Sequence, residues 1–414
     1  MDLYPHLHPR PATGWVNDPN GIGFWDGRWH VMMQWNPGSA RWGDIHWAHL
    51  SSPDLVTWEE HPAALTPRPG AIDAGGCWSG VATVDDAGVR CLVYSATPRG
   101  PEEAGVAIAR DRGDGTYAQP DAMILPQPDG AAFEHIRDPF LFRHEGRRLG
   151  LQGCGRDGRG AALLFEVAEF DRWEPLGVLL AAADVPDPLP SRGQIWECPQ
   201  LVRVGETWVL VVSWADLDNG PRGAVAYAGD LVADQGGYRF EPRTGVTLDH
   251  GPDFYAPQAA QVGARAVVFG WSDEGTGPGA RTQEEIDASG WAGTMTLPRE
   301  VVLDDAGLAR LRIVPEARAL VGDAVGAPAP EGGTRIVDPA WMATATGPWR
   351  LSLTGPDGER DVAAGDGPAE VWVDGSIVEA FGPEGSTTLR AYPAEDEAWA
   401  WHATGAAPRE LRLP

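Results

Sequence analysis

A repeat of about sixty residues constrains the fold of this chain more than any other feature of the sequence. In five places a polar motif precedes a short apolar strand, a tight turn containing Gly or Asp, and a second apolar strand. The motifs are marked by Asp18, Ser79, Asp138, Cys198 and Pro257, at successive spacings of 61, 59, 60 and 59 residues. A later aromatic series keeps a similar step, at Trp58, Tyr117, Trp173 and Phe240. A unit of this length, with about four strands, has the size of one β-propeller blade, so the spacing predicts five blades.

The pattern changes after residue 300. Short alternating strands are expected at residues 349–353, 370–373, 377–381 and 388–392, with turns at 355–358 and 374–375. Such spacing is typical of a β-sandwich. The 53 glycines and 37 prolines also favour many turns, and the one helical pattern, at residues 282–288, is short. We therefore predict an all-β chain, with a five-bladed β-propeller catalytic domain over residues 1–300 and a β-sandwich over residues 301–414.

The net charge of -27 argues against nucleic acid or an anionic membrane surface as a partner, whereas a neutral sugar is compatible with it. No apolar run of about 18 residues is present, so no transmembrane helix is expected. The N-terminus lacks the basic and apolar regions of a secretion signal, which predicts a cytoplasmic location. Cys77, Cys91, Cys154 and Cys198 have no zinc-ligand spacing and are predicted to be free buried thiols. The alternative is that Cys77 and Cys91 face each other across a hairpin.

Three acidic residues occupy the polar motifs of different repeat units: Asp18 in WVNDPNG, Asp138 in IRDP, and Glu197 in WECP. Equivalent positions of successive blades converge around one axis, so these side chains are expected at one mouth of the central channel. Cleavage of an acetal needs a nucleophile or base at the anomeric carbon and a proton for the leaving oxygen, and paired carboxyl groups supply both. Each acid alone also fits a structural role, as a turn residue, a surface ion pair or a solvent-facing strand residue.

The neighbours of these acids predict their ionisation. Arg137 adjoins Asp138, where it could keep that acid ionised or hold substrate hydroxyls. Trp196 and Cys198 flank Glu197, and if they exclude water they raise its pKa, as a general acid requires.

Aromatic and amide side chains near the motifs are candidates for sugar binding. The chain has 19 tryptophans, whose flat faces can stack on sugar rings. Trp42, Trp47, Trp78 and Trp271 lie near the blade motifs, with core packing as the alternative for each. Gln34 could bind sugar hydroxyls, or simply end a strand.

These motifs resemble those of glycoside hydrolase family 32, the family of invertases, inulinases and levanases. The resemblance covers most of the chain, through His8-Pro9, WVNDPNG at 15–21, QWNP at 34–37, residues 44–47, 51–55 and 77–80, IRDP at 136–139, WECP at 196–199, residues 253–258 and 291–300, and DGSIVEAF at 374–381. Members of this family have a five-bladed propeller followed by a β-sandwich, which agrees with the repeat.

The resemblance implies a role for each matching residue. Asp18 matches the nucleophile, Glu197 the acid/base, and Asp138 the transition-state stabiliser, with Arg137 beside it. The positions that match those holding the fructosyl unit are Asn17, Gln34, Trp42 and Ser79. The implied reaction is a retaining, two-step hydrolysis of fructosyl bonds in sucrose or short fructo-oligosaccharides, without a metal or organic cofactor.

Three alternatives share these motifs. A fructosyltransferase would use the same residues with a sugar in place of water, and a sucrose-6-phosphate hydrolase would need a basic pocket for the phosphate. A non-catalytic fructan-binding protein would tolerate loss of the acids, all three of which are present. A homo-oligomer is possible, although no motif specifies one.

Overall fold

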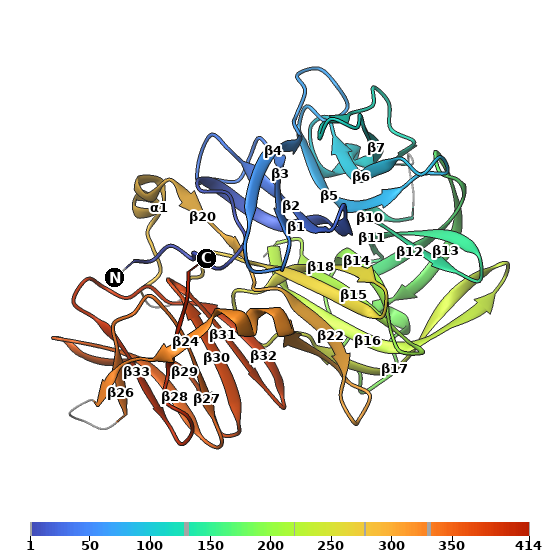
Figure 1. The fold of residues 1–414 in the computed structure, drawn as a ribbon. Helices are drawn as coiled ribbons and strands as arrows, with labels where there is room; N and C mark the ends of the chain where they lie inside the picture. The colour runs from blue at the N-terminus through green and yellow to red at the C-terminus, as the bar shows by residue number, and fades with distance from the viewer. Residues whose placement is uncertain (1, 128–131, 219, 277–278, 329–332, 414) are drawn as a thin grey trace.

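A computed structural model describes residues 2–127, 132–218, 220–276, 279–328 and 333–413 (Figure 1). These residues form seven β-sheets, and the described part of the chain contains one α-helix, α1 (Gln283–Ser289). The predicted all-β class is therefore confirmed. None of the helices in these ranges has the length and apolar character needed to cross a membrane.

Five sheets occupy the first three quarters of the chain. The first holds β1 (Gly14–Trp25), β2 (Arg28–Asn36), β3 (His46–Ser52), β4 (Glu59–Leu65) and β20 (Trp291–Ala292). The second holds β5 (Gly76–Val84), β6 (Arg90–Thr97), β7 (Gly105–Asp111), β8 (Tyr117–Ala118) and β9 (Leu125–Pro126). The third holds β10 (Glu134–His144), β11 (Arg147–Arg156), β12 (Arg159–Glu169) and β13 (Arg172–Ala181). The fourth holds β14 (Ile195–Val204), β15 (Thr207–Asp216), β16 (Gly220–Asp234) and β17 (Gly237–Thr247). The fifth holds β18 (Tyr255–Val262), β19 (Arg265–Ser272), β21 (Thr294–Met295), β22 (Arg299–Leu303) and β23 (Ala309–Ile313).

The five sheets form a closed ring. The first strand of each sheet contacts the first strand of the next, and β18 returns to contact β1. Strand β20 also joins the two ends of the ring. It follows β19 of the fifth sheet in the chain and pairs in parallel with β1 of the first sheet. Each residue that marked the sixty-residue period lies in one of these first strands, β1, β5, β10, β14 or β18.

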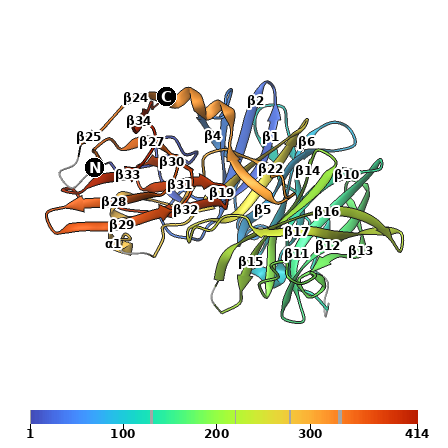
Figure 2. The same cartoon turned by 90° about the horizontal axis from the view of Figure 1, so that it is seen from below.

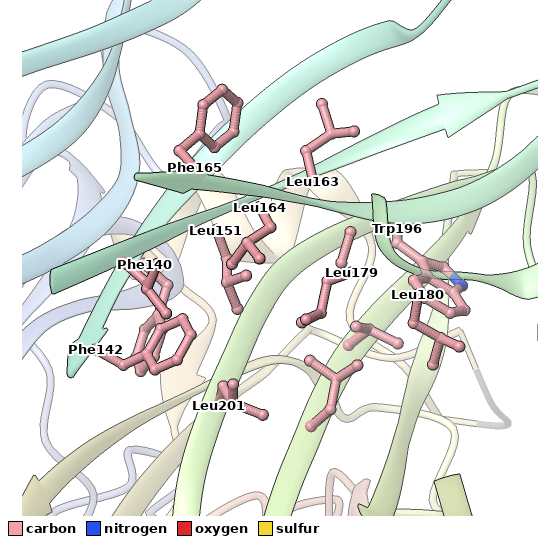
Figure 3. Close-up of a cluster of buried hydrophobic side chains, with 14 of the residues drawn as sticks. Phe140, Phe142, Leu151, Leu163, Leu164, Phe165, Leu179, Leu180, Trp196 and Leu201 are labelled. Carbon is pink, nitrogen blue, oxygen red and sulfur yellow. The ribbon is translucent and has the colours of Figure 1, made fainter. Parts of the chain in front are cut away.

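Apolar side chains fill the space between adjacent sheets of the ring. Figure 3 shows Phe140 and Phe142 of β10 with Leu201 of β14, and Leu179 of β13 with Trp196 of β14. Because the third sheet is covered on both faces, β12 has a nearly continuous buried run at residues 160–165 in place of an alternating one.

The last quarter of the chain forms two antiparallel sheets packed face to face (Figure 2). One sheet runs in the order β24 (Val321–Ala324), β34 (Arg409–Leu411), β27 (Ala340–Ala345), β30 (Ala369–Asp374), β31 (Ile377–Gly382) and β32 (Gly385–Arg390). The other runs in the order β25 (Ala327–Pro328), β26 (Thr334–Ile336), β33 (Ala398–Ala403), β28 (Trp349–Gly355) and β29 (Gly358–Gly365). Trp341, Trp399 and Val371 lie in the core between them. The strand expected at 388–392 begins and ends earlier, as β32.

A few short helices lie between the strands. The described residues include three 3-10 helices, η1 (Pro101–Glu103), η2 (Ala182–Asp184) and η3 (Pro315–Leu320). The helix expected at residues 282–288 is α1, which begins after Thr282 because the Thr282 and Glu285 side chains form a capping box. The fifth sheet continues to Ile313, whereas the domain boundary expected from the sequence lies at residue 300.

The four cysteines are free and buried, as predicted. Cys77 lies opposite Ala96 and Cys91 opposite Thr83 in the β5–β6 hairpin, so the two thiols do not face each other.

Candidate active site

A β-bulge interrupts the first strand of every sheet in the ring, beside the residue that marks the sequence repeat. The register shifts lie between Val16 and Pro19, Trp78 and Gly80, Arg137 and Phe140, Glu197 and Gln200, and Tyr255 and Gln258. Bulges turn side chains away from the regular alternation of a strand and are frequent beside functional sites. Here they direct polar side chains from five sheets toward one end of the ring.

These side chains surround a cavity of about 430 Å³. Nine of the ten site residues expected from the sequence line it: Asn17, Asp18, Gln34, Trp42, Trp78, Arg137, Asp138, Glu197 and Trp271. The tenth, Ser79, is fully buried and hydrogen-bonded to Asp18. The structure therefore places all ten together, although they span more than half of the sequence.

Asp18 lies in a network of short hydrogen bonds. The Ser79 hydroxyl donates to Oδ2 of Asp18 at 2.6 Å, and the amide groups of Gln34 and Asn17 donate to its two oxygens at 3.2 and 3.1 Å. Gln34 also donates to Ser79 and accepts from Asn17, so the three residues hold one another. Burial raises the pKa of Asp18 above its ordinary value, and the charge of Glu197 adds to this, while the Ser79 and Asn17 hydrogen bonds oppose it.

Glu197 is held by two donors from neighbouring sheets. The Arg137 guanidinium donates through Nε to Oε1 of Glu197 at 3.1 Å and also through Nη2, and the Tyr255 hydroxyl donates to Oε2. Although burial acts in the opposite direction, the charge of Arg137 and these hydrogen bonds lower the pKa of Glu197. The prediction of a raised pKa from Trp196 and Cys198 is therefore wrong, because charged and polar partners outweigh exclusion of water.

Asp138 has the opposite electrostatic environment. Burial raises its pKa to about 7, the charges of Glu197 and Asp18 raise it as well, and Arg137 opposes them. Arg137 lies 3.9 Å from the Asp138 carboxylate, farther than from Glu197, so the expectation that it keeps Asp138 ionised is also wrong. The backbone N–H of Cys198 donates to Oδ2 of Asp138 at 3.0 Å and orients this carboxyl group.

The four tryptophans considered for sugar binding occupy three different places: the rim of the cavity, its wall and the protein core. Trp42 is 58% exposed at the rim, 6.4 Å from the Trp78 ring. Trp78 and Trp271 line the wall, and their indole N–H groups have no hydrogen-bond partner among the described residues. These N–H groups are themselves buried, so the two tryptophans offer a ligand the apolar faces of their rings. Trp47 is fully buried and donates to the Cys77 carbonyl, so it belongs to the core, the alternative stated for it.

Three lining residues with titratable side chains were missed from the sequence: Tyr255, His135 and Asp216. Tyr255 lies in the polar motif of the fifth repeat unit, two residues before Pro257, so the repeat could have identified it. His135 and Asp216 lie outside the motifs and carried no such signal. In the ranges described above, no group of three or more His, Cys, Asp or Glu side chains is arranged to hold a metal ion.

Comparisons with known proteins identify the family of this chain. The family model described as the glycosyl hydrolases family 32 N-terminal domain matches residues 8–315. The sucrose-6-phosphate hydrolase of Klebsiella pneumoniae is 34% identical over 338 residues, which cover 78% of this chain and 69% of the relative. The enzyme of the same name from Escherichia coli is 32% identical over 337 residues, covering 77% of this chain and 66% of the relative. The chain spans only 60% of the corresponding protein of Zymomonas mobilis.

Solved structures share the fold. The GH32 β-fructofuranosidase of Bombyx mori has a TM-score of 0.80 at 24% identity, over 99% of this chain and 94% of that chain. The sucrose-6-phosphate hydrolase of Lactobacillus gasseri has a TM-score of 0.81 at 22% identity, over 99% and 93% of the two chains.

Proposed function

Because this chain belongs to glycoside hydrolase family 32, we propose that it is a retaining β-fructofuranosidase acting on sucrose and short fructo-oligosaccharides. One observation carries the proposal: Asp18, Asp138 and Glu197, from three different sheets, line a single cavity whose wall also contains tryptophan side chains. The names of relatives, sucrose-6-phosphate hydrolase, raffinose invertase and β-fructofuranosidase, all describe hydrolysis of glycosidic bonds.

In the proposed first step, Asp18 attacks C2 of the fructosyl unit while Glu197 protonates the departing oxygen. Water, activated by Glu197, then breaks the covalent bond to Asp18 and releases fructose with retained configuration. Asp138 stabilises the positive charge that develops on the sugar ring. The first step requires the neutral form of Glu197, although Arg137 and Tyr255 lower its pKa, so substrate binding has to bring a proton onto this carboxyl group.

Asn17, Gln34 and Ser79 serve two purposes in this proposal. All three orient Asp18 through the network described above, and Asn17 and Gln34 also line the cavity, where their remaining donors and acceptors serve fructosyl hydroxyls. Trp42, Trp78 and Trp271 supply apolar faces to the sugar. The mechanism uses no metal or organic cofactor.

Membership of this family also supports a proposal about the domain organisation. We interpret the closed ring of five sheets as a five-bladed β-propeller and the two C-terminal sheets as a β-sandwich. We place the division between the two domains in η3, after Ile313, because the fifth sheet ends there and the family match ends at residue 315. A cytoplasmic location and homo-oligomer formation stay predictions; four free thiols are compatible with the first.

Two further activities use the same residues. Sucrose 6-phosphate is a second candidate substrate, because several relatives are named for its hydrolysis. Transfer of the fructosyl unit to a sugar in place of water is another outcome, and product analysis at high sucrose concentration separates transfer from hydrolysis. A non-catalytic role is disfavoured by the shared cavity of the three acids.

The first prediction concerns Asp18. We expect fructose release from sucrose and kestose, with Asp18→Asn lowering turnover at least about a thousandfold because no nucleophile remains. Inulin and levan assayed in parallel define the chain-length preference, and circular dichroism checks that the variant is folded. A folded Asp18→Asn protein that keeps substantial activity would overturn the assignment, and binding of sucrose without fructose release would exclude the enzyme itself.

A further inference from the structure

The charges around the cavity bear on which leaving groups it accepts. Four carboxyl groups line it, those of Asp18, Asp138, Glu197 and Asp216. Two more, Glu102 and Glu134, interact electrostatically with His135 at the wall. Acidic side chains therefore dominate the cavity, in a chain whose net charge is -27.

Arg137 and His135 are the basic groups among the described lining residues. Arg137 is already engaged, since Nε and Nη2 donate to Glu197 and Nη1 donates to the His135 carbonyl at 3.2 Å. Burial, together with the charge of Arg137, lowers the pKa of His135, so this ring is neutral near pH 7.

The arginines around the rim are paired as well. Arg222 lies 3.5 Å from Asp216, Arg41 beside Trp42 pairs with Asp287, and Arg99 near Pro101 pairs with Glu103. Arg192 has no carboxylate partner in the described ranges, but its guanidinium lies over the Trp214 ring and it does not line the cavity.

No other source of positive charge is available to the site. All 32 basic residues of the chain other than histidine are arginines, and the residues outside the described ranges include no Arg, Lys or His. Arginine and lysine are the usual partners of phosphate groups.

We infer that this site selects fructosides with an uncharged leaving group and discriminates against sucrose phosphorylated on its glucosyl unit, with Asp216 as a residue that determines this specificity. The inference rests on the proposed function and adds the substrate class. A phosphate group carries about -1.5 to -2 charges at neutral pH, and in the cavity it would meet four carboxyl groups and one arginine, Arg137, that already bonds Glu197. Asp216 acts twice, because its carboxylate repels the phosphate and also pairs with the rim cation Arg222.

The test compares kcat/KM for sucrose and for sucrose 6-phosphate at pH 7. We expect sucrose to be preferred by at least about tenfold at low ionic strength, since like charges brought together in a binding site disfavour the charged ligand. Added NaCl should narrow the preference through screening. Equal or better use of sucrose 6-phosphate would overturn the inference and leave the fructosidase intact. Cleavage of neither substrate would remove both the proposed function and the inference.

A matched pair of variants tests the assignment to Asp216. Asp216→Asn removes one negative charge and frees Arg222, so the ratio of phosphorylated to unphosphorylated turnover should rise roughly three- to tenfold. Asp218→Asn removes an equal charge from the same loop at an exposed position that does not line the cavity, and the ratio should stay within about twofold. An unchanged ratio in Asp216→Asn, or an equal rise in both variants, would overturn the role of Asp216.

Discussion

Arg137 controls the distribution of charge among the three acids. It is closer to Glu197 than to Asp138, so the pKa of Glu197 is lowered while burial and neighbouring carboxylates raise the pKa values of Asp138 and Asp18. Closely spaced acids that share one cation release their protons as a unit. In the proposed double displacement Asp18 must be ionised and Glu197 protonated, which is the reverse of this pKa order, so a proton has to move onto Glu197 when substrate binds.

Tyr255 provides a second prediction at this scale. Its hydroxyl donates to Glu197 and helps to lower the pKa of that acid, so Tyr255→Phe should raise it. Because Glu197 must be protonated to act as the acid, the alkaline limb of the profile of kcat/KM against pH should move upward by roughly one pH unit.

Tyr227→Phe is the matched control for this measurement. Tyr227 is also fully buried, but its hydroxyl donates to the Pro190 carbonyl, away from the three acids. Its profile should keep the wild-type limb. A limb that moves downward, or stays in place, in folded Tyr255→Phe would contradict the proposed effect on Glu197.

The residues of the site were predictable from the sequence, but their electrostatics were not. Arg137 adjoins Asp138 in the chain, and this suggested that it pairs with that acid. Successive side chains of an extended strand point in different directions, so Arg137 instead reaches Glu197 of the adjacent sheet. Adjacency in sequence is thus a poor guide to charge pairing within a strand.

At the scale of the strand, the repeat predicted the five first strands and their turns, but not the bulges that orient the acids. Asp138, Cys198 and Ala256 have φ values of 60°, 47° and 46°, in the left-handed region that normally favours glycine. Non-glycine residues carry no local signal for this conformation. It forms here where the neighbouring sheets meet, through contacts such as the Cys198 N–H with Asp138.

The first sheet contains a buried histidine pair that predicts acid sensitivity. Nδ1 of His30 and Nε2 of His49 share a hydrogen bond at 2.9 Å between β2 and β3, which needs one of these two nitrogens without a proton. Burial lowers the pKa of His30 to about 4 and that of His49 to about 3. The unfolded chain binds these protons near pH 6.5, so stability conferred by the neutral rings is lost as pH falls below that value.

We expect the free energy of unfolding to decrease between about pH 6.5 and pH 4, by up to roughly 1.4 kcal/mol per pH unit for each histidine. His49→Gln keeps a polar partner for His30 but cannot titrate, so it should flatten this dependence in urea unfolding experiments. His6→Gln is the control, because the His6 ring lies near the surface and, within the described ranges, forms its side-chain hydrogen bond with Asp2. A slope in His49→Gln equal to that of the wild type would show that other groups cause the acid sensitivity.

At the scale of the whole molecule, the DGSIVEAF segment at residues 374–381 joins the C-terminal sheets to the ring of five sheets. It does not line the cavity expected to bind substrate. Asp374 accepts hydrogen bonds from the backbone of His6 and Leu7, while Glu379 accepts from the backbone of Leu297. Strand β32 lies against β19 and β23 of the ring (Figure 2). None of these residues lines the cavity, so the segment is expected to affect stability more than catalysis.

Arg299 and Glu379 form the centre of this contact, and the last prediction concerns them. Both side chains are fully buried, with Nη2 of Arg299 3.1 Å from Oε1 of Glu379 and Nη1 3.0 Å from Oδ2 of Asp249. Glu379→Ala leaves Arg299 with one carboxylate, and breaking a buried pair in this way costs about 3–5 kcal/mol. We expect a corresponding loss in the free energy of unfolding, measured in denaturant.

The KM of the protein that remains folded should be unchanged, because the cavity lies in the ring alone. Glu384→Ala, which truncates an exposed carboxylate without an ion pair in the described ranges, should have little effect. Equal stability of the two variants would mean that apolar packing, and not this ion pair, holds the sandwich against the ring.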